Sequence, residues 1–357
     1  MFIIAEIGTS HEGSIDKAKL LVEKAKFAGA DCVKFQWVYA DEILHPNTGF
    51  VNLPTGKIPL YQRFKELEVN PEFFYKLREF SSELNIKFMC SPFGPKSLID
   101  LLQINPNFIK IASPELNYIQ LLNLLNEKND KNIPVVLSSG VSKLSDIENA
   151  LECFSNTDNL TLLHCITSYP APETEYNLNL IKNLSSILGI KTGVSDHSLS
   201  PYIVPLLSLY CGATMLEKHI TLNNDDLGLD DPVALNIENF KKMTDSIKQA
   251  KLISKDDLFI ELKKHFGEIV DKTLGSGVKK LAKSEKDNYT RTNRSLRFMK
   301  DLSKGDIITS NDIGILRTEK ILEVGVHPIF LDNFIGKKIT KDIKSGDAVN
   351  WSCIIEK

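Results

Sequence analysis

The chain has 357 residues and a formal net charge of −3, so it lacks the basic excess that is typical of nucleic-acid-binding proteins. No stretch is long and apolar enough to span a bilayer, and Glu6 follows the first apolar residues too early for a signal peptide. The 6 cysteines are scattered without a Cys-x-x-Cys pair, which is typical of reduced thiols. We therefore expect a cytoplasmic protein without nucleic-acid or membrane partners.

Short apolar runs alternate with helical patterns through the first 253 residues. The runs end in polar residues and lie at 4–7, 33–36, 88–91, 109–113, 135–139, 162–165, 193–196 and 215–219. Apolar residues recur at helical spacing between them, at 17–27, 73–84, 119–125, 146–154 and 240–253. Repeated strand–helix units form parallel sheets. The pattern predicts an α/β fold, a closed (β/α)8 TIM barrel whose active site lies at the carboxyl ends of the strands.

The character of the chain changes after residue 253, which predicts a second domain. We assign residues 1–254 to the barrel, 255–293 to a polar, partly ordered linker, and 294–357 to a small β-rich domain. The last segment contains a near-repeat, Asp-Leu-Ser-Lys-Gly-Asp-Ile and Asp-Ile-Lys-Ser-Gly-Asp-Ala, and each copy predicts a turn beside a short strand. A domain of this size is marginally stable alone, so we expect it to pack on another surface.

Two histidines end neighbouring strands of the predicted barrel. His197 closes the run Val-Ser-Asp-His, and His219 closes the run Leu-Glu-Lys-His. Alternate residues of a strand share a face, so Ser195 lies with His197 and Glu217 with His219, all facing one lumen. Two neutral imidazoles can hold a divalent ion and leave positions open for substrate oxygen and water. A lone histidine here is more often structural, whereas the pair favours a metal site.

Lysines inside the predicted barrel favour a functional interpretation. Lys34 and Lys110 lie on strands where an unpaired ammonium group would be costly to bury. With strand-end hydroxyl and amide groups, they suit a small, highly charged phosphorylated substrate. Glu6 is placed to pair with one of these lysines, and Glu12 lies on a loop where packing does not require a carboxylate. For His164 a structural role is slightly favoured.

A series of short motifs resembles the sialic acid (N-acetylneuraminate) synthase family. The motifs are Ala-Glu-Ile-Gly at 5–8, His-Glu-Gly at 11–13, Val-Lys-Phe-Gln at 33–36, Ser-Pro-Phe at 91–93, Lys-Ile-Ala-Ser at 110–113, Leu-Ser-Ser-Gly at 137–140, Leu-His-Cys at 163–165, Tyr-Pro at 169–170, Ser-Asp-His at 195–197 and Glu-Lys-His at 217–219. The C-terminal part, with Lys-Gly-Asp at 304–306 and Gly-Lys-Lys at 336–338, resembles the antifreeze-like SAF domain that follows the barrel in that family. The resemblance covers nearly the whole chain.

The resemblance implies a condensation of phosphoenolpyruvate with an N-acetylated amino sugar such as N-acetylmannosamine, giving a nine-carbon 2-keto sugar acid and phosphate. It implies that His197 and His219 bind Mn²⁺ or Mg²⁺, and that Glu115 activates water. Glu12 and Lys110 are the other expected catalytic residues. The residues expected to bind substrate are Lys34, Ser91, Lys110, Ser113, Ser138, Thr167, Tyr169, Ser195, Glu217, Asp230 and Arg317. By the same resemblance, Arg317 reaches the acetamido group of the sugar from the partner subunit of a domain-swapped homodimer.

The acceptor sugar stays open at this point. Legionaminic and pseudaminic acid synthases, which use deoxy diacetamido sugars, and a spore-coat polysaccharide branch share nearly all of these motifs. The long loop at 40–63 is expected to help shape the sugar pocket. Two alternatives remain, a different phosphoenolpyruvate-condensing or metal-dependent barrel aldolase and a catalytically silent carbohydrate-binding or scaffold protein. The histidine pair and both lysines argue against a silent protein.

Overall fold

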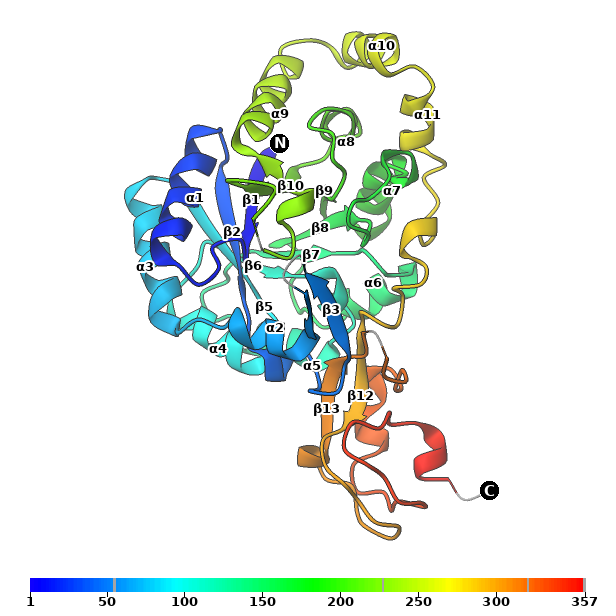
Figure 1. Ribbon diagram of the computed structural model, residues 1–357. Helices are drawn as coiled ribbons and strands as arrows, with labels where there is room; N and C mark the ends of the chain where they lie inside the picture. Colours follow the sequence, from blue (N-terminus) through cyan, green and yellow to red (C-terminus); the bar gives the residue numbers. More distant parts are fainter. Residues whose placement is uncertain (54–55, 227, 320, 356–357) are drawn as a thin grey trace.

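The computed structural model describes residues 1–53, 56–226, 228–319 and 321–355, and its larger part is a closed barrel (Figure 1). The barrel strands are β1 (Phe2–Gly8), β2 (Cys32–Trp37), β5 (Lys87–Pro92), β6 (Phe108–Ile111), β7 (Val135–Ser138), β8 (Leu160–Cys165), β9 (Lys191–Asp196) and β10 (Met215–Thr221). All neighbouring strands are parallel, and β10 pairs with β1 to close the ring. The TIM barrel predicted from the sequence is confirmed, and each predicted run overlaps one of these strands.

Helices surround the barrel on its outer side (Figure 1). They are α1 (Ile15–Phe27), α3 (Pro71–Glu83), α4 (Pro95–Gln103), α5 (Ile119–Lys128), α6 (Leu144–Leu151), α7 (Asn179–Leu188), α8 (Ile203–Tyr210) and α9 (Ile237–Ala250). The predicted helical stretches overlap α1, α3, α5, α6 and α9. The pattern did not single out α4, α7 or α8. Helix α8 is apolar on nearly all sides, so it has no polar face to mark the helical period.

Side chains that point into the barrel change from apolar to polar along each strand. An apolar cluster forms the floor and consists of Ile4, Cys32, Met89, Val136 and Leu163. Two residues further along the same strands, and therefore on the same inward face, lie Glu6, Lys34, Ser91, Ser138 and Cys165. The floor closes the barrel below, so the polar side chains open only toward the carboxyl ends of the strands.

The predicted linker is more ordered than its composition indicated. It contains helices α10 (Lys255–Phe266) and α11 (Ile269–Leu274), and the ring of Phe259 stacks on Tyr210 of α8 with centroids 5.2 Å apart. Glu285 is buried and accepts hydrogen bonds from the backbone N–H of Val141 at 2.9 Å and of Thr167 at 3.0 Å. The polar composition of this segment therefore did not indicate how ordered it is, because one of its polar residues is a buried carboxylate that binds two loops of the barrel.

The second domain extends away from one side of the barrel and begins with β12 (Arg294–Phe298), which pairs antiparallel with β13 (Ile313–Arg317) (Figure 1). Its near-repeat forms two turns that lie against each other. Leu302 and Ile343 exchange backbone hydrogen bonds of 3.1 and 2.9 Å. The Asp301 carboxylate accepts from the backbone N–H of Ser345 in the second turn, and the Asp342 carboxylate accepts from the first turn, both at 2.8 Å. The repeat is thus a reciprocal capping arrangement.

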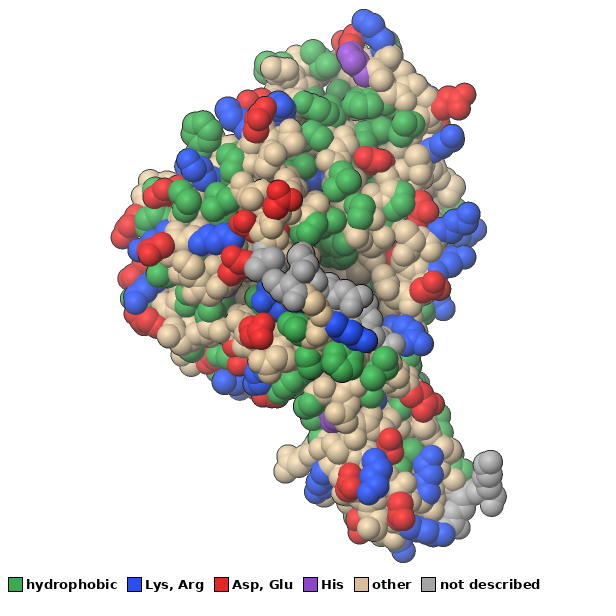
Figure 2. Space-filling view, viewed as in Figure 1, with side chains coloured by type: hydrophobic (Ala, Val, Ile, Leu, Met, Phe, Trp, Pro, Cys, Tyr) green, Lys and Arg blue, Asp and Glu red, His purple; other side chains and the backbone are tan. Residues whose placement is uncertain are grey.

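The surface carries both signs of charge. On the face shown in Figure 2, lysine and arginine side chains are interspersed with aspartate and glutamate over both domains. Among the helices in the described ranges, none is long and apolar enough to cross a membrane. The 6 cysteines are all free thiols, as the scattered pattern predicted.

His164 of β8 has a structural role, as predicted. It points away from the barrel lumen, is buried, and its Nε2 lies 2.6 Å from the carbonyl oxygen of Tyr176. Burial, helped by the charge of Lys279, lowers the pKa of His164 to about 3. The folded protein therefore keeps this imidazole neutral at pH values where an unfolded chain, with a histidine pKa of about 6.5, takes up a proton.

We predict that His164 makes the stability of the protein depend on pH. The folded-state pKa is depressed, so the contribution is fully present above about pH 6.5 and is lost as the pH falls toward 3, by up to roughly 1.4 kcal/mol per pH unit. His164→Gln keeps an N–H donor but removes the titration, so the free energy of unfolding should decline less steeply between pH 6.5 and 4. Urea denaturation at several pH values measures this, with the exposed His265→Gln as control. An unchanged slope in His164→Gln would contradict the prediction.

Candidate active site

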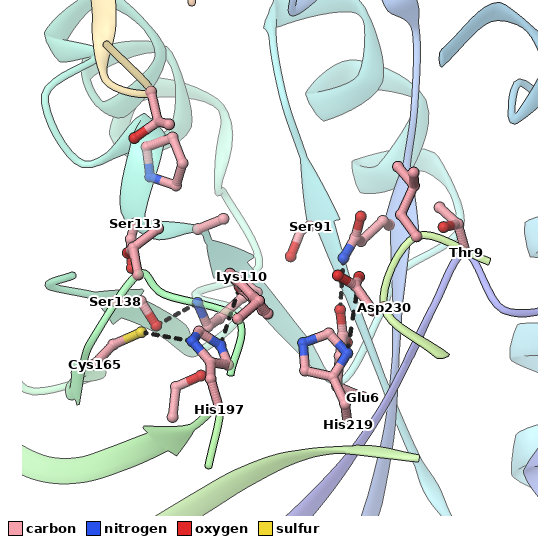
Figure 3. Close-up of a pocket in the computed structure, with 18 of the residues that line it drawn as sticks. Glu6, Thr9, Ser91, Lys110, Ser113, Ser138, Cys165, His197, His219 and Asp230 are labelled. Atoms are coloured by element: carbon pink, nitrogen blue, oxygen red, sulfur yellow. Dashed lines mark hydrogen bonds and ion pairs between the residues drawn. The ribbon is translucent and has the colours of Figure 1, made fainter. Parts of the chain in front are cut away.

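A cavity of about 490 Å³ opens at the carboxyl ends of the barrel strands (Figure 3). Most of the residues expected to act on substrate line this one cavity. They are Lys34, Ser91, Lys110, Ser113, Ser138, Thr167, Tyr169, Ser195, His197, Glu217, His219, Asp230 and Arg317. Side chains that are up to 283 residues apart in sequence, Lys34 and Arg317, are thus brought to the same place by closure of the ring and docking of the second domain.

Two buried lysines lie deep in the cavity and differ in their partners. The Lys34 ammonium is 2.8 Å from Glu6 Oε2 and 3.7 Å from Glu217 Oε1. Burial alone would lower the pKa of Lys34, but the two carboxylates outweigh it and raise that pKa. Lys110 donates to Ser138 Oγ at 2.7 Å and forms no ion pair with the described residues, and burial lowers its pKa. Among the described residues no carboxylate forms an ion pair with Lys110, and the charges of Glu217 and Glu6 act on it without direct contact.

Three strand ends approach closely beside Lys110, and a glycine makes this possible. The Gly140 N–H donates to Ser113 Oγ at 3.0 Å. A Cβ atom at Gly140 would lie 2.2 Å from Thr167 Oγ1 and 2.9 Å from Ser113 Oγ, so no larger residue fits. Thr167 Oγ1 is buried and has no hydrogen-bond partner. Because buried hydroxyl groups are normally paired, this one is available to an oxygen-rich ligand.

The histidine pair lies at the cavity wall, with ring centroids 5.6 Å apart (Figure 3). His197 Nδ1 is 2.8 Å from the carbonyl oxygen of Ile166, which makes Nδ1 the protonated nitrogen and leaves Nε2 as the acceptor. His197 Nε2 lies 3.1 Å from the Tyr169 hydroxyl, and His219 Nδ1 lies 3.8 Å from Asp230 Oδ2. Burial lowers the pKa of both histidines, so both imidazoles are neutral and each has one ring nitrogen with a lone pair.

The two histidine nitrogens would supply only part of the ligands of a divalent ion. Within the described ranges, no group of three His, Cys, Asp or Glu side chains is arranged to hold a metal. His197 and His219 would supply two neutral nitrogen ligands, and Asp230 lies beside them. An ion bound by this pair would complete its coordination with substrate oxygen and water, which is the arrangement of catalytic rather than structural metal sites.

A buried ion pair on the outer face of the barrel ties together the two strands that carry the histidines. Lys218 of β10 lies 2.7 Å from Asp196 Oδ2 of β9, and both side chains are almost fully buried. Lys218 also donates to the backbone carbonyl of Ser198. Since His197 and His219 each follow one of these residues directly, the pair limits how far the imidazoles can move apart.

Glu115 was expected to activate water in the cavity, and the structure places it elsewhere. Its side chain is fully buried, and it is not among the cavity-lining residues. Oε1 of Glu115 accepts from Arg294 at 2.9 Å and from Arg317 at 2.8 Å. Both guanidinium groups donate to this one carboxylate oxygen, so the geometry favours a role in docking these arginines.

Glu12 was expected to be catalytic, and it too lies outside the cavity wall. It occupies a turn with φ of 50° after β1, and its carboxylate forms an ion pair of 2.9 Å with Lys17. Lys17 also binds Asp226 at 2.7 Å. The sequence motif placed Glu12 near a strand end, but the turn directs its side chain to the surface.

Several cavity residues were not predicted from the sequence. Gln36 shares the inward face of Lys34, as the alternation of the strand predicts, but no role was assigned to it. Its amide donates to Glu6 Oε1 at 2.8 Å. Other residues come from segments that are distant in sequence and carry no pattern that marks them. These are Phe64, Leu67, Leu229, Asn288 and Thr292, whereas Thr9 directly follows β1.

Arg317 lines the cavity and is positioned by its own chain. Its backbone N–H donates to the carbonyl of Ile43 at 2.9 Å, and its guanidinium lies 5.3 Å from the centre of the Phe93 ring. It was expected to enter from a partner subunit, whereas the contacts here are within one chain. Domain swapping exchanges identical elements, so the same contacts would form between subunits of a swapped dimer. The swap therefore stays a prediction.

The fold and the site define a (β/α)8 barrel protein whose mouth is completed by a second domain. A sequence model of the NeuB family matches residues 21–257, and one of the SAF domain matches residues 293–355. The chain therefore belongs to the NeuB family and carries a SAF domain, as the motifs indicated. The SAF match begins one residue before β12 (Arg294–Phe298).

Relatives match over almost the full length of the chain. The N,N'-diacetyllegionaminic acid synthase of Legionella pneumophila is 30% identical over 99% of this chain and 94% of its own. The crystal structure of the spore coat polysaccharide biosynthesis protein SpsE of Bacillus subtilis has a TM-score of 0.83 at 29% identity and covers 100% of this chain and 95% of that one. The sialic acid synthetase of Leptospira borgpetersenii, in complex with citrate, has a TM-score of 0.63 at 30% identity over 75% and 92% of the two chains.

Two buried arginines of β12 differ in the domain that they contact, so their removal should affect stability differently. Arg294 donates to Glu115 and to the carbonyl of Phe93 at 2.6 Å, both in the barrel. Among the described residues, Arg297 donates only to groups in the second domain, including the carbonyl of Glu323 at 2.6 Å. Arg294→Gln should destabilise both domains, by roughly 1–3 kcal/mol for each buried carbonyl that loses its donor, while Glu115 keeps its ion pair with Arg317. Arg297→Gln should act mainly on the second domain.

The 2 tryptophans of the chain separate these effects, because Trp37 lies in β2 and Trp351 lies in the second domain. Fluorescence-detected unfolding of Trp351→Phe and Trp37→Phe backgrounds reports on each domain in turn. Arg294→Gln should shift the Trp37 transition, and Arg297→Gln should leave it nearly unchanged. Equal shifts of the Trp37 transition in the two variants would show that Arg294 does not dock the domains.

Proposed function

We propose that this protein is a nonulosonic (sialic-type) acid synthase that condenses phosphoenolpyruvate, an N-acylated amino sugar and water into a nine-carbon 2-keto sugar acid and phosphate. The observation that carries the proposal is the placement of two buried lysines and a neutral histidine pair in one cavity. The names of the relatives in Legionella pneumophila and Leptospira borgpetersenii support the same class of reaction.

Phosphoenolpyruvate would bind at the deep end of the cavity. Lys110 has no carboxylate partner among the described residues, so an anionic ligand would neutralise it. Ser113, Ser138 and the unpaired hydroxyl of Thr167 surround the same region and can donate to phosphate or carboxylate oxygens. The carboxylates of Glu6 and Glu217 pair with Lys34 and keep that lysine ionised.

The amino sugar would bind nearer the mouth, with its aldehyde beside the histidine pair. We propose that His197 and His219 hold Mn²⁺ or Mg²⁺, which when bound would polarise the aldehyde oxygen. The enol carbon of phosphoenolpyruvate then attacks the aldehyde carbon, water adds to the resulting cationic carbon, and phosphate leaves with its bridging oxygen. Tyr169, whose hydroxyl contacts His197, and Asp230, which lies beside His219, would orient the sugar.

Glu115 has a different part in this proposal from the one expected of it. Its carboxylate holds Arg317, and Arg317 in turn lines the mouth of the cavity. Charge-assisted bonds of this kind fix the direction of a guanidinium group, which can then donate to the acyl oxygen of an N-acylated sugar. The second domain would thus contribute to binding the acceptor.

The reaction is tested by release of inorganic phosphate from phosphoenolpyruvate in the presence of amino sugars. Chelation should abolish this release, and Mn²⁺ or Mg²⁺ should restore it. His219→Ala should remain folded but lose most turnover, because removal of an electrophilic metal forfeits several kcal/mol of transition-state stabilisation. His265→Ala, an exposed control, should behave as the parent protein. Full turnover by His219→Ala would remove the metal site from the proposal.

Arg317→Ala tests the contribution of the second domain. Loss of a hydrogen bond to a charged group costs about 1.5–3 kcal/mol, so use of the amino sugar should fall by about one to two decades while phosphoenolpyruvate affinity changes little. In a domain-swapped homodimer, mixing Arg317→Ala with His219→Ala subunits should restore activity, because one mixed site regains an intact barrel and an intact arginine. No recovery after verified subunit exchange would mean that each chain completes its own site, as the contact with Glu115 does here.

A further inference from the structure

The connector between the two domains contacts the loops that follow β7 and β8, and these loops form part of the cavity wall. From α11 onward the connector runs along the barrel past α7 and α6 to β12 (Figure 1). Lys279 donates to the carbonyl oxygen of Ser139 at 2.9 Å, and Asn288 lines the cavity. The connector is therefore part of the candidate active site.

The backbone of Thr167, in the loop after β8, is held by the connector on both sides. Its N–H donates to Glu285 Oε2 at 3.0 Å, and its carbonyl oxygen accepts from the Asn288 side chain at 2.9 Å. Thr167 Oγ1, in contrast, is buried without a hydrogen-bond partner. Because the connector fixes this stretch of backbone, it also sets where the unpaired hydroxyl group lies at the cavity wall.

The loop after β7 is held by the same carboxylate. The Val141 N–H donates to Glu285 Oε2 at 2.9 Å, and the Val141 carbonyl accepts from the Asn293 side chain at 3.2 Å. Val141 has a φ of 41°, which is unfavourable for a β-branched residue. A backbone conformation of this kind persists only where the surrounding structure imposes it. The two connector residues therefore hold this loop in a conformation that it would not adopt alone.

The conformation of this loop brings it against the unpaired hydroxyl group. Gly140 precedes Val141, and a Cβ atom there would lie 2.2 Å from Thr167 Oγ1. The Gly140 N–H donates to Ser113 Oγ at 3.0 Å, so the loop also meets a second hydroxyl group of the cavity. Both hydrogen bonds to Glu285 Oε2 thus act on the same place, the wall around Thr167 Oγ1.

The bonding of Glu285 distinguishes it from a carboxylate that only joins two parts of a fold. It is buried, does not line the cavity, and its Oε1 accepts from the Ala282 N–H at 3.1 Å. Among the described residues, its hydrogen-bond donors are backbone N–H groups. A substitution of Glu285 therefore changes the support of two loops without breaking a contact to the substrate.

Resting on the proposed function, we propose that Glu285 is a positioning residue for phosphoenolpyruvate, through the hydroxyl group of Thr167. The carboxylate holds both loops so that this hydroxyl donates to a phosphate or carboxylate oxygen of the substrate. The hydroxyl is already desolvated and unpaired, so it loses no other partner when the anion binds. The connector thereby contributes to affinity for the anionic substrate, although it lies outside the barrel.

The histidine pair depends less on Glu285. The carbonyl oxygen of Ile166, in the same peptide group as the Thr167 N–H, accepts from His197 Nδ1. His197 has further support, because its backbone N–H donates to the Tyr176 hydroxyl at 2.6 Å and the ion pair of Lys218 joins the two strand ends. We therefore expect loss of Glu285 to affect phosphoenolpyruvate more than the metal.

Direct binding of phosphoenolpyruvate tests the inference without turnover, by isothermal titration calorimetry of the full chain in the presence of Mn²⁺. Glu285→Ala removes the acceptor of two N–H groups and frees the Thr167 hydroxyl to move. The Kd for phosphoenolpyruvate should rise by about 10- to 100-fold, the loss expected for a hydrogen bond to a charged ligand. Glu285→Gln keeps an oxygen that can accept from both N–H groups, so its Kd should stay within about threefold of the parent value. An unchanged Kd in Glu285→Ala overturns the inference.

Glu175 provides a matched control for loosening of the connector. Its carboxylate accepts from the backbone N–H and from Oγ of Ser284, both at 2.9 Å, so it too joins the connector to the barrel. Neither residue lines the cavity. Glu175→Ala should lower the free energy of unfolding and leave the Kd for phosphoenolpyruvate unchanged. A comparable rise of Kd in Glu175→Ala and Glu285→Ala would show that general loosening controls affinity, which contradicts the role given to Glu285.

A double-mutant cycle identifies the group through which Glu285 acts. Thr167→Val removes Oγ1 and keeps the shape of the side chain and its backbone N–H. Glu285→Ala should therefore raise the Kd much less in the Thr167→Val background than in the parent chain, and additive increases would refute the assignment. Glu285→Asp, which is one methylene shorter and cannot reach both loops, replaces Glu285→Ala in the cycle if that variant does not fold.

The same measurements separate this inference from the proposed reaction. If the parent protein releases phosphate from phosphoenolpyruvate while Glu285→Ala binds phosphoenolpyruvate with the parent Kd, the inference fails and the proposed reaction stands. If the parent protein binds no phosphoenolpyruvate, both fail.

Discussion

Closure of the barrel between its first and last strands is the constraint on which the site depends. Glu6 of β1 pairs in register with Lys34 of β2 on one side and with His219 of β10 on the other. The salt bridge between Lys34 and Glu6, with Glu217 close by, therefore joins strands from both ends of the barrel sequence. An ion pair with this little exposure persists only where geometry and further hydrogen bonds offset desolvation, and Gln36 and Ser195 supply such bonds to the two carboxylates.

The distribution of charge inside the barrel follows from the period of two along each strand. Apolar residues close the floor, and the residues two positions further on are those that would meet a small anion. Lys34 forms ion pairs with two carboxylates, and Lys110 forms none with the described residues. Lys34 therefore helps to hold the site together, and Lys110 is available to a ligand.

The second domain is attached by buried polar contacts rather than by a long flexible tether. Arg294 and Arg317 converge on one oxygen of Glu115, and Asn117 exchanges hydrogen bonds of 2.9 and 3.0 Å with the backbone of Arg294. The connector contributes as well, because Glu285 holds two loops at the barrel mouth. The part of the cavity lined by Arg317 therefore depends on the docking of a domain that lies outside the barrel.

Much of this protein could be predicted from local sequence, and the reason is periodicity. Alternation within strands marked the eight barrel strands, and it placed Lys34, Lys110, His197 and His219 on inward faces, because parallel strands impose one direction and one period on their side chains. The repeated turn of the second domain could also be predicted, because one short pattern recurs in the sequence. Within the cavity, alternation also explains Gln36 and Val38 once the strand direction is known.

Long-range contacts decided the rest. Glu115 and Glu12 belong to motifs near strand ends, yet two arginines from the second domain hold the first and a surface lysine pairs with the second. Phe64, Asn288 and Thr292 enter the cavity from segments whose composition carries no functional mark. A sequence pattern records the period of one element and its preferred burial, but not which distant element will pack against it. The inward face of the barrel was thus determined by the sequence alone, and the outer cavity wall, the docked arginines and the buried connector were decided only by tertiary structure.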